Sequence, residues 1–319
     1  RGLGDVYKRQ DWKGLHSLAE SIRVINPPNG WIQNCNSTPF TSAGEFSPKK
    51  ENYPSYMSRD EENFRSLHAI RLLKESVDMD LDKLIKLAYD PYLPAFEILI
   101  PGLIKAYDQS EKEAALSAPI EILRNWDFAV SKESVAMTLA HYYGANYLKK
   151  GGRPDGLKFI ELVRYWSEAS PASERLVLFK NVIADLNKDF GSWNQPWGHV
   201  NRYQRLNGAI RQNFSDEKPS LPIGLASGNC GDLAAYGSSY DNNTKKIYGT
   251  RGNSFVAVVS FGDRLKAKSI LAGGQSGDPS SPHFDDQISM YANRSFKDVA
   301  FYKEDVEARS QIKYQPGLR

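Results

Sequence analysis

The 319-residue sequence has only two cysteines, Cys35 and Cys230, which are too few for a disulfide framework. One disulfide between them and two free thiols are both compatible with the sequence. It also lacks an apolar run of the roughly 18 residues that a membrane-spanning helix needs. The longest candidate, residues 91–106, contains Glu97, Lys105 and three prolines. We therefore expect no membrane span.

An excess of one charge sign is missing as well. The 41 Lys and Arg residues nearly balance the 38 Asp and Glu residues, and the formal net charge is +3. Proteins that bind nucleic acid usually carry a much stronger basic patch, so we expect no nucleic-acid partner. Hydrophobic residues at 40% and charged residues at 25% are typical of a folded chain with a sizeable core.

The start of the chain shows no export signal. Its first residue is Arg rather than Met, and residues 1–10 contain no apolar stretch. We interpret these ten residues as a non-native leader and expect the chain to be part of a longer protein. The missing signal therefore says little about the compartment in which the protein works.

Three zones follow the leader. Residues 11–58 are rich in Asn, Pro, Ser and Gly, with short strand signals at 23–25 and 31–33. Residues 59–190 show helical periodicity, whereas residues 191–319 show strand and turn patterns. This order predicts an α+β fold, a helical block followed by a β-rich block within one continuous domain.

Individual elements can be predicted within these zones. Hydrophobic spacing and start signals favour helices at 64–76, 80–88, 119–125, 133–148, 156–167 and 171–187, with a short closing helix within 304–313. Apolar runs at 255–261 and 268–272 predict two strands, and Gly262-Asp263 between them predicts a tight turn.

Metal and phosphate motifs are not evident. The five histidines are scattered and lie in no zinc-binding spacing: His16, His68, His141, His199 and His283. Asp285 and Asp286 offer oxygen ligands, but a pair of carboxylates in a turn is usually only solvated. The glycine-rich residues 273–277 lead into Pro279 and Pro282 rather than into a helix, which argues against a phosphate-binding loop.

One cysteine is a candidate nucleophile. Cys230 lies between glycines in Gly-Asn-Cys-Gly-Asp (228–232), and His199 could serve as its base. No motif or spacing links the two residues, so a structural thiol is the favoured interpretation. The sequence also has no G-x-S-x-G pattern, so it does not support an α/β-hydrolase serine.

The most informative segment is residues 26–39, NPPNGWIQNCNSTP. Its amide side chains stay neutral, so they cost less to bury than Lys or Arg and can donate N–H bonds to a developing oxyanion. Asn clusters also commonly cap loops. The segment alone does not choose between these two roles.

Five motifs lie in order along almost the whole chain. They are residues 11–14 with 26–36 (DWKG and NPPNGWIQNCN), 63–73 (NFRSLHAIRLL), 197–202 (WGHVNR), 252–255 with 274–277 (GNSF and GQSG), and 281–287 (SPHFDDQ). In this order they resemble the β subunit of the penicillin acylases, which are N-terminal nucleophile hydrolases. The resemblance implies the C-terminal portion of an αββα fold.

The resemblance also assigns roles. Asn36 aligns with the asparagine whose amide completes the oxyanion hole, and Arg65 with the arginine that orients the active site. The family nucleophile, an N-terminal serine, has no counterpart in this chain. Two departures are Ser37, where many members have a second Asn, and a longer loop at 38–63. Asp60 is only a candidate for the calcium ligand of many relatives, because no carboxylate aligns cleanly.

The function implied by the resemblance is hydrolysis of the amide bond of N-acylated small molecules such as acyl-homoserine lactones, β-lactams or lipopeptides. The pattern at 197–202 and residues 224–229 favour the branch of aculeacin and acyl-homoserine lactone acylases. Expected partners are the missing part of the β chain, an α chain and the substrate, in the periplasm or outside the cell. The chemistry needs no cofactor, although structural calcium is compatible with it. The alternative is a non-catalytic ligand-binding relative with the same fold.

Overall fold

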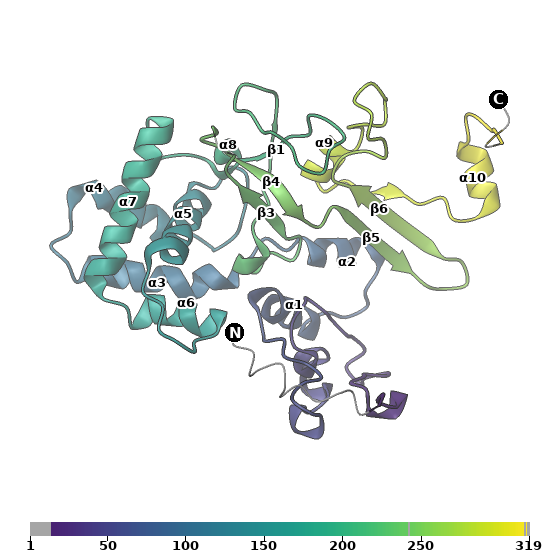
Figure 1. The fold of residues 1–319 in the computed structure, drawn as a ribbon, viewed down its shortest axis with the longest axis horizontal. Coiled ribbons are helices and arrows are strands. Elements are labelled where there is room, and N and C mark those ends of the chain that lie inside the picture. Colours follow the sequence, from purple (N-terminus) through teal and green to yellow (C-terminus); the bar gives the residue numbers. More distant parts are fainter. Residues whose placement is uncertain (1–13, 242, 316, 318–319) are drawn as a thin grey trace, which may run out of the picture.

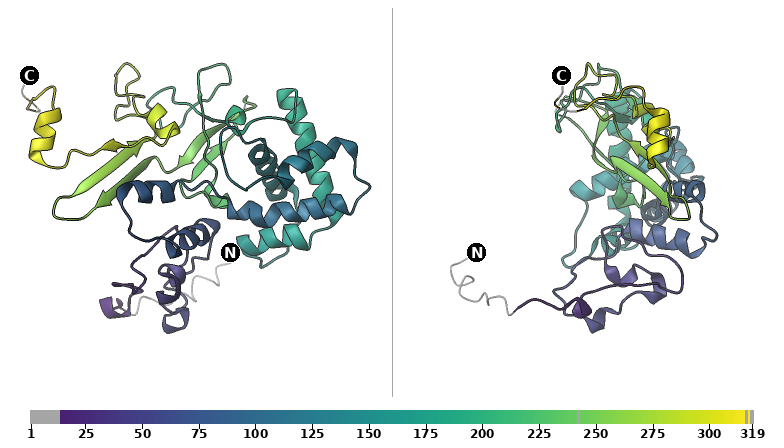
Figure 2. Two further views of the ribbon diagram at one scale, coloured as in Figure 1. Left: turned by 180° about the vertical axis from the view of Figure 1, so that it is seen from behind. Right: turned by 90° about the vertical axis from the view of Figure 1, so that its right-hand side faces the viewer.

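The structure, a computed structural model, describes residues 14–241, 243–315 and 317. A helical layer lies beside two small sheets, and residues 14–62 form a loop-rich segment next to α1 (Phe64–Lys74; Figure 1). The view from behind shows α10 (Lys303–Arg309) at the end of the molecule that is remote from the helical layer (Figure 2, left). The predicted leader at 1–10 and residues 11–13 lie outside the described residues.

The loop-rich segment contains no strand among its described residues. The predicted strands at 23–25 and 31–33 are therefore wrong. A strand needs a neighbour that completes its hydrogen-bond ladder, and the Gln33 N–H donates only to the Ser42 carbonyl, at 2.8 Å. Four short 3₁₀ helices take their place: η2 (Leu18–Glu20), η3 (Pro39–Thr41), η4 (Gly44–Phe46) and η5 (Lys50–Asn52).

The six helices predicted for the middle zone are confirmed, and the structure adds a seventh at 94–108 that was not predicted. Three of them begin at a residue whose side chain accepts a bond from a free backbone N–H of the first turn: Asn63, Asp80 and Ser134. The helices are α1 (Phe64–Lys74), α2 (Leu81–Ala88), α3 (Pro94–Asp108), α4 (Ala114–Arg124), α5 (Val135–Lys150), α6 (Phe159–Glu168) and α7 (Ala172–Phe190). The apolar segment at 91–106 thus forms most of a buried helix and not a membrane span. None of the described helices combines the length and the apolar character that a bilayer crossing requires.

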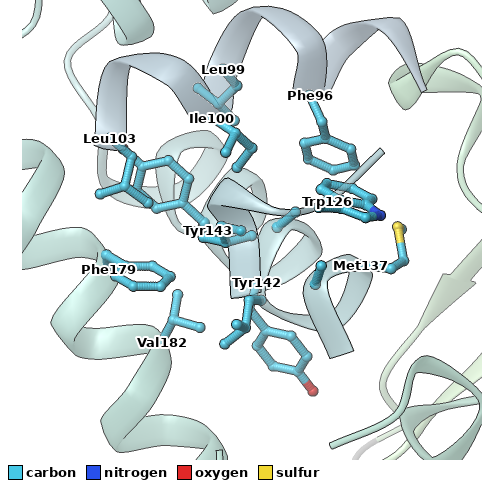
Figure 3. Close-up of a cluster of buried hydrophobic side chains, with 14 of the residues drawn as sticks. Phe96, Leu99, Ile100, Leu103, Trp126, Met137, Tyr142, Tyr143, Phe179 and Val182 are labelled. Carbon is cyan, nitrogen blue, oxygen red and sulfur yellow. The ribbon is translucent and has the colours of Figure 1, made fainter. Parts of the chain in front are cut away.

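The main hydrophobic core lies where α3, α5 and α7 meet. Figure 3 shows Phe96 and Leu99 of α3 above Tyr143 of α5, with Phe179 and Val182 of α7 on the other side. Tyr143 and Phe179 are fully buried, and their rings meet edge to face at 5.8 Å. Fully burying one such side chain stabilises a fold by about 1.5–3 kcal/mol, so this cluster anchors the helical layer.

The β-rich zone forms two sheets. One has the strand order β2-β1-β4-β3 and the other β5-β6-β7. The two predicted strands become β5 and β6, an antiparallel hairpin that turns at Gly262-Asp263, as predicted. The elements are α8 (Trp197–Val200), β1 (Asn201–Tyr203), β2 (Leu221–Pro222), η6 (Gly228–Cys230), β3 (Tyr236–Ser239), β4 (Ile247–Gly252), β5 (Phe255–Ser260), β6 (Lys266–Leu271), α9 (Ile288–Ala292), β7 (Lys297–Asp298) and α10 (Lys303–Arg309).

The motif at 197–202 joins the helical layer to the first sheet. The Gly198 N–H donates to the Lys132 carbonyl at 2.7 Å, and a Cβ at Gly198 would lie 2.8 Å from the Lys132 Cβ. Trp197 donates its indole N–H to the Leu225 carbonyl, and the Asn201 amide donates to the same oxygen. This motif therefore has a structural role. The mixed fold, with helices before strands, is the predicted α+β class, whereas the proposed zone limits stay a prediction.

A close helix contact gives a stability test. A Cβ at Gly102 of α3 would lie 2.1 Å from the Ser167 carbonyl oxygen of α6. We expect Gly102→Ala to lower the free energy of unfolding by about 1–3 kcal/mol, because backbone would have to move. Gly144→Ala in α5 is the matched control, since its Cβ would lie 3.7 Å from Phe96. That variant should gain about 0.5–1 kcal/mol from helix propensity.

Urea unfolding followed by far-UV circular dichroism measures both changes. Equal stability of Gly102→Ala and the parent would show that the two helices do not pack as closely as described.

Candidate active site

The structure brings Asn36 and Arg65 together, although they are 29 positions apart. Arg65 lies in the first turn of α1, and its Nη2 donates to the Asn36 Oδ1 at 2.8 Å. The same Nη2 donates to the Cys35 carbonyl at 2.7 Å. One guanidinium nitrogen thus holds both the backbone and the side chain of the segment that the sequence singled out.

This contact fixes which way the Asn36 amide faces. A guanidinium only donates hydrogen bonds, so the amide oxygen must face Arg65 and the amide nitrogen must face away. No described residue accepts a bond from Asn36 Nδ2. Asn36 is exposed and lines a cavity of about 580 Å³ together with residues of the loop-rich segment, among them Gln33, Ser37 and Asp60. The free donor is therefore available to a molecule in that cavity.

The backbone at Asn36 has an unusual conformation. Its φ is +55°, in the left-handed region that few residues other than Gly adopt, Asn among them. The Asn36 N–H donates to the Asn34 Oδ1 at 2.9 Å, which stabilises the turn locally. The turn and the Arg65 contact together hold the amide at the edge of the cavity.

Asn63 is a positioning residue that the sequence analysis assigned no role. Its Oδ1 accepts from the Ser66 N–H and so caps α1, while its Nδ2 donates to the carbonyls of Cys35 and Asn36 at 3.0 and 3.3 Å. An Asn directly before a helical pattern is a recognisable capping signal. No sequence pattern indicates its second role, which is to bond the carbonyls of Cys35 and Asn36.

The far side of Arg65 rests against η6. A Cβ at Gly228 would lie 2.9 Å from the Arg65 Cδ, so only Gly leaves room for the side chain. His68, one turn after Arg65, bonds the Gly231 carbonyl through Nδ1 at 2.8 Å and Asp90 through Nε2 at 3.0 Å. η6 is thereby tied to α1, and Arg65 is held between η6 and the Asn36 turn.

The structure does not support Cys230 as a nucleophile. Burial raises the pKa of its thiol to about 12, so it stays neutral and unreactive. His199 lies elsewhere and bonds the Gln195 side chain at 2.5 Å. Both cysteines are free, which decides the question left open by the sequence in favour of two thiols. Burial also raises the pKa of Cys35, partly opposed by the charge of Arg65.

The other predicted ligand residues do not gather around a metal. Asp60 lines the same cavity as Asn36. Within the described parts of the chain, however, no three His, Cys, Asp or Glu side chains come together in a way that could hold an ion. The calcium ion therefore stays a prediction. His283 and Asp286 bond each other at 3.0 Å across their turn, which is the structural role that the sequence favoured.

A buried carboxylate shapes the loop that carries η6. Asp232 is almost fully buried and accepts hydrogen bonds from the N–H groups of Ala226 and Ala234, at 2.5 and 3.0 Å. Burial raises its pKa to about 6, although both bonds and the charges of Arg294 and His68 act in the opposite direction. This side chain closes residues 226–234 into the compact turn against which Arg65 packs.

A solved structure has a similar fold. It is a thermostable penicillin G acylase from Alcaligenes faecalis, with a TM-score of 0.54 and 15% sequence identity. The match covers 97% of this chain but only 60% of that protein. The two chains therefore share their arrangement of helices and sheets, and this chain spans about three fifths of the length of that protein's chain.

The family follows from the sequence itself. The model of the penicillin amidase family matches residues 6–308, which is nearly the whole chain. The chain belongs to this family. The resemblance found in the five motifs is thus confirmed, whereas no comparison distinguishes the branches within the family.

The raised pKa of Asp232 gives a pH test. Below pH about 3.8 the carboxyl is protonated in both states, and between about 3.8 and 6 only the folded state keeps the proton. The contribution of Asp232 to stability must therefore fall as the pH rises through this window, by up to about 3 kcal/mol at 1.36 kcal/mol per pKa unit. In Asp232→Asn this fall should be absent.

Urea unfolding at pH 4 and at pH 6.5 measures the free energy of unfolding of the parent and of Asp232→Asn. The change between the two pH values is compared between the proteins, because the other groups titrate equally in both. A difference that does not change with pH would show that the Asp232 pKa is normal.

Proposed function

We propose that this chain supplies the oxyanion-stabilising side of an amide hydrolase that cleaves N-acylated small molecules. The observation that carries the proposal is the Arg65 contact, which occupies the Asn36 amide oxygen and leaves the Nδ2 donor free on a residue that lines the cavity. Membership of the penicillin amidase family supports it. The nucleophile is an N-terminal serine from a part of the protein outside these 319 residues.

The reaction begins with attack of the serine oxygen on the amide carbonyl. The serine's own α-amine takes the hydroxyl proton, directly or through a water molecule. The carbonyl oxygen then gains negative charge, and Asn36 Nδ2 donates a hydrogen bond to it. As this intermediate collapses and the C–N bond breaks, the α-ammonium returns its proton to the leaving nitrogen. The free amine departs and leaves an acyl ester, which water hydrolyses to the carboxylic acid and the free serine.

Arg65 has three tasks in this scheme. It prevents the Asn36 amide from rotating and presenting its oxygen, which would repel the oxyanion. All bonds of Arg65 to described residues begin at Nη2, so its other N–H groups remain to orient the serine segment. Because a guanidinium keeps its charge at any working pH, it also adds a fixed positive charge beside the reacting carbonyl.

The finer assignments rest on the family. We propose acyl-homoserine lactones, β-lactams or lipopeptides as substrates, and a periplasmic or secreted precursor that cleaves itself to free the serine. The partners would be an α chain and the remaining part of the β chain. Calcium, if bound, would have a structural role and would take no part in the chemistry. A relative that binds such ligands without cleaving them is the competing function, and turnover distinguishes the two.

Asn36→Ala tests the oxyanion role. In the complete protein we expect kcat for a chromogenic N-acyl substrate to fall about a hundred- to thousandfold, since losing one such donor costs about 2.7–4 kcal/mol. Asn213→Ala, at an exposed position elsewhere, is the matched control and should keep parental activity. Undiminished turnover by Asn36→Ala would refute the assignment, and a parent that binds the substrate without cleaving it would favour the binding protein.

Arg65→Lys tests the positioning role. A lysine is shorter and lacks the rigid guanidinium plane, so its ammonium is not held at the Nη2 position that bonds both the Cys35 carbonyl and the Asn36 amide. We expect kcat to fall roughly tenfold or more while KM changes little, which corresponds to about 1.4 kcal/mol per factor of ten. Arg71→Lys is the control in the same helix, because Arg71 pairs with Glu97 and lies over the Tyr92 ring, away from Asn36. Equal kcat values for the two variants would remove Arg65 from the site.

A further inference from the structure

A second cavity, of about 180 Å³, opens between the helical layer and the first sheet. It is bounded by α3, α5, α6, η6 and β3. It shares η6 with the candidate active site, because Gly228 packs on Arg65 while Cys230 lines this cavity. Most of its lining is apolar or aromatic: Phe96, Leu99, Phe159, Val163, Trp166 and Trp197.

His141 of α5 is the polar side chain that stands out in this lining. Its ring packs on the Trp197 ring with centroids 4.7 Å apart. No described residue makes a hydrogen bond to either ring nitrogen. Burial lowers its pKa to about 4, so near neutral pH the imidazole is uncharged and offers one donor and one acceptor. His141 is half-buried and lines the cavity, so its ring nitrogens are available to a ligand there or to water.

The other groups around His141 add no charge to the interior. The Cys230 thiol is neutral, as described above. Arg251 lines the cavity but is exposed, and its side chain lies across Gly237, where a Cβ would come within 2.6 Å of the Arg251 Cγ. The lining is therefore mainly apolar, with the His141 imidazole and the side chains of Ser227, Asn229 and Ser238 as neutral polar groups, and it disfavours an ionised group.

The volume limits the size of the occupant. Engineered apolar cavities of about 150 Å³ stay dry and bind benzene. A cavity of about 180 Å³ therefore accepts one aromatic ring or a chain of similar bulk. It is too small for a typical drug-sized ligand, whose pockets measure about 300–1,000 Å³.

We propose that this cavity is a binding site for a small uncharged phenol or alcohol, with its apolar body between the aromatic side chains and its hydroxyl bonded to His141. The proposal does not depend on the proposed function, since it concerns residues that take no part in the oxyanion contact. It predicts a preference for a hydroxyl compound over its methyl isostere.

Phenol and toluene are the matched probes, because they have nearly the same shape and differ in one hydroxyl. Isothermal titration calorimetry with the complete protein at pH 7 measures both affinities, and ligand-observed NMR gives an independent reading. We expect saturable one-to-one binding of both probes. When each association constant is divided by that probe's own water-to-cyclohexane partition coefficient, the value for phenol should be at least threefold higher than the value for toluene. Failure of both probes to bind would overturn the proposal.

Two variants locate the site. A Cβ at Gly144 faces Phe96 and Leu99 at 3.7 and 3.8 Å, so Gly144→Leu should fill the cavity and weaken both probes at least tenfold. Ala118→Leu on the exposed side of α4 is the control and should change neither affinity. His141→Phe keeps a ring but removes the nitrogens, so the phenol preference should disappear while toluene still binds.

His141→Phe keeps the proposal testable even if Gly144→Leu folds poorly. Unchanged binding in folded Gly144→Leu would place the probes elsewhere on the chain. An unchanged phenol preference in His141→Phe would show that His141 is not the partner of the hydroxyl.

Discussion

The bond from Arg65 Nη2 to the Asn36 amide is the contact on which the candidate site depends. An amide can present either end to a cavity, and the two ends have opposite effects on an oxyanion. Because the guanidinium cannot accept a hydrogen bond, its position selects the donating end. The second bond of the same nitrogen, to the Cys35 carbonyl, fixes the backbone that carries the amide. One cation thus determines both the place and the direction of the donor.

This arrangement requires Arg65 itself to be immobile, and three features of the fold make it so. The side chain starts from the first turn of a capped helix, where Asn63 satisfies a free N–H and also holds the Asn36 turn. Gly228 leaves space for its methylene groups. The buried Asp232 closes the loop behind that glycine by two backbone bonds. Because the Arg65 side chain is packed on one side and hydrogen-bonded on the other, few rotamers are accessible to it.

The sequence predicted the parts of this fold that depend on local pattern. Helix periodicity located the helices of the middle zone, and an apolar run, a Gly-Asp turn and a second run located the β5–β6 hairpin. The same reasoning failed at 23–25 and 31–33, because a strand also depends on a neighbouring chain that local pattern cannot reveal. Asn36 and Arg65 were found only through the order of five motifs. The supporting residues Gly228 and Asp232 act through contacts with α1 and with buried backbone, which leave no regular spacing in the sequence.

The choice of asparagine at position 36 follows from two separate constraints that the same side chain meets. The turn needs a residue that tolerates a φ of +55°, which favours Gly or Asn over most others. A glycine would satisfy the backbone but would offer no donor to the cavity. A lysine or arginine would bring a donor, but it would place a second positive charge beside Arg65 and would fit the left-handed backbone poorly. Asparagine adopts the conformation, bonds to Arg65 through its oxygen and still has a neutral N–H donor to direct into the cavity.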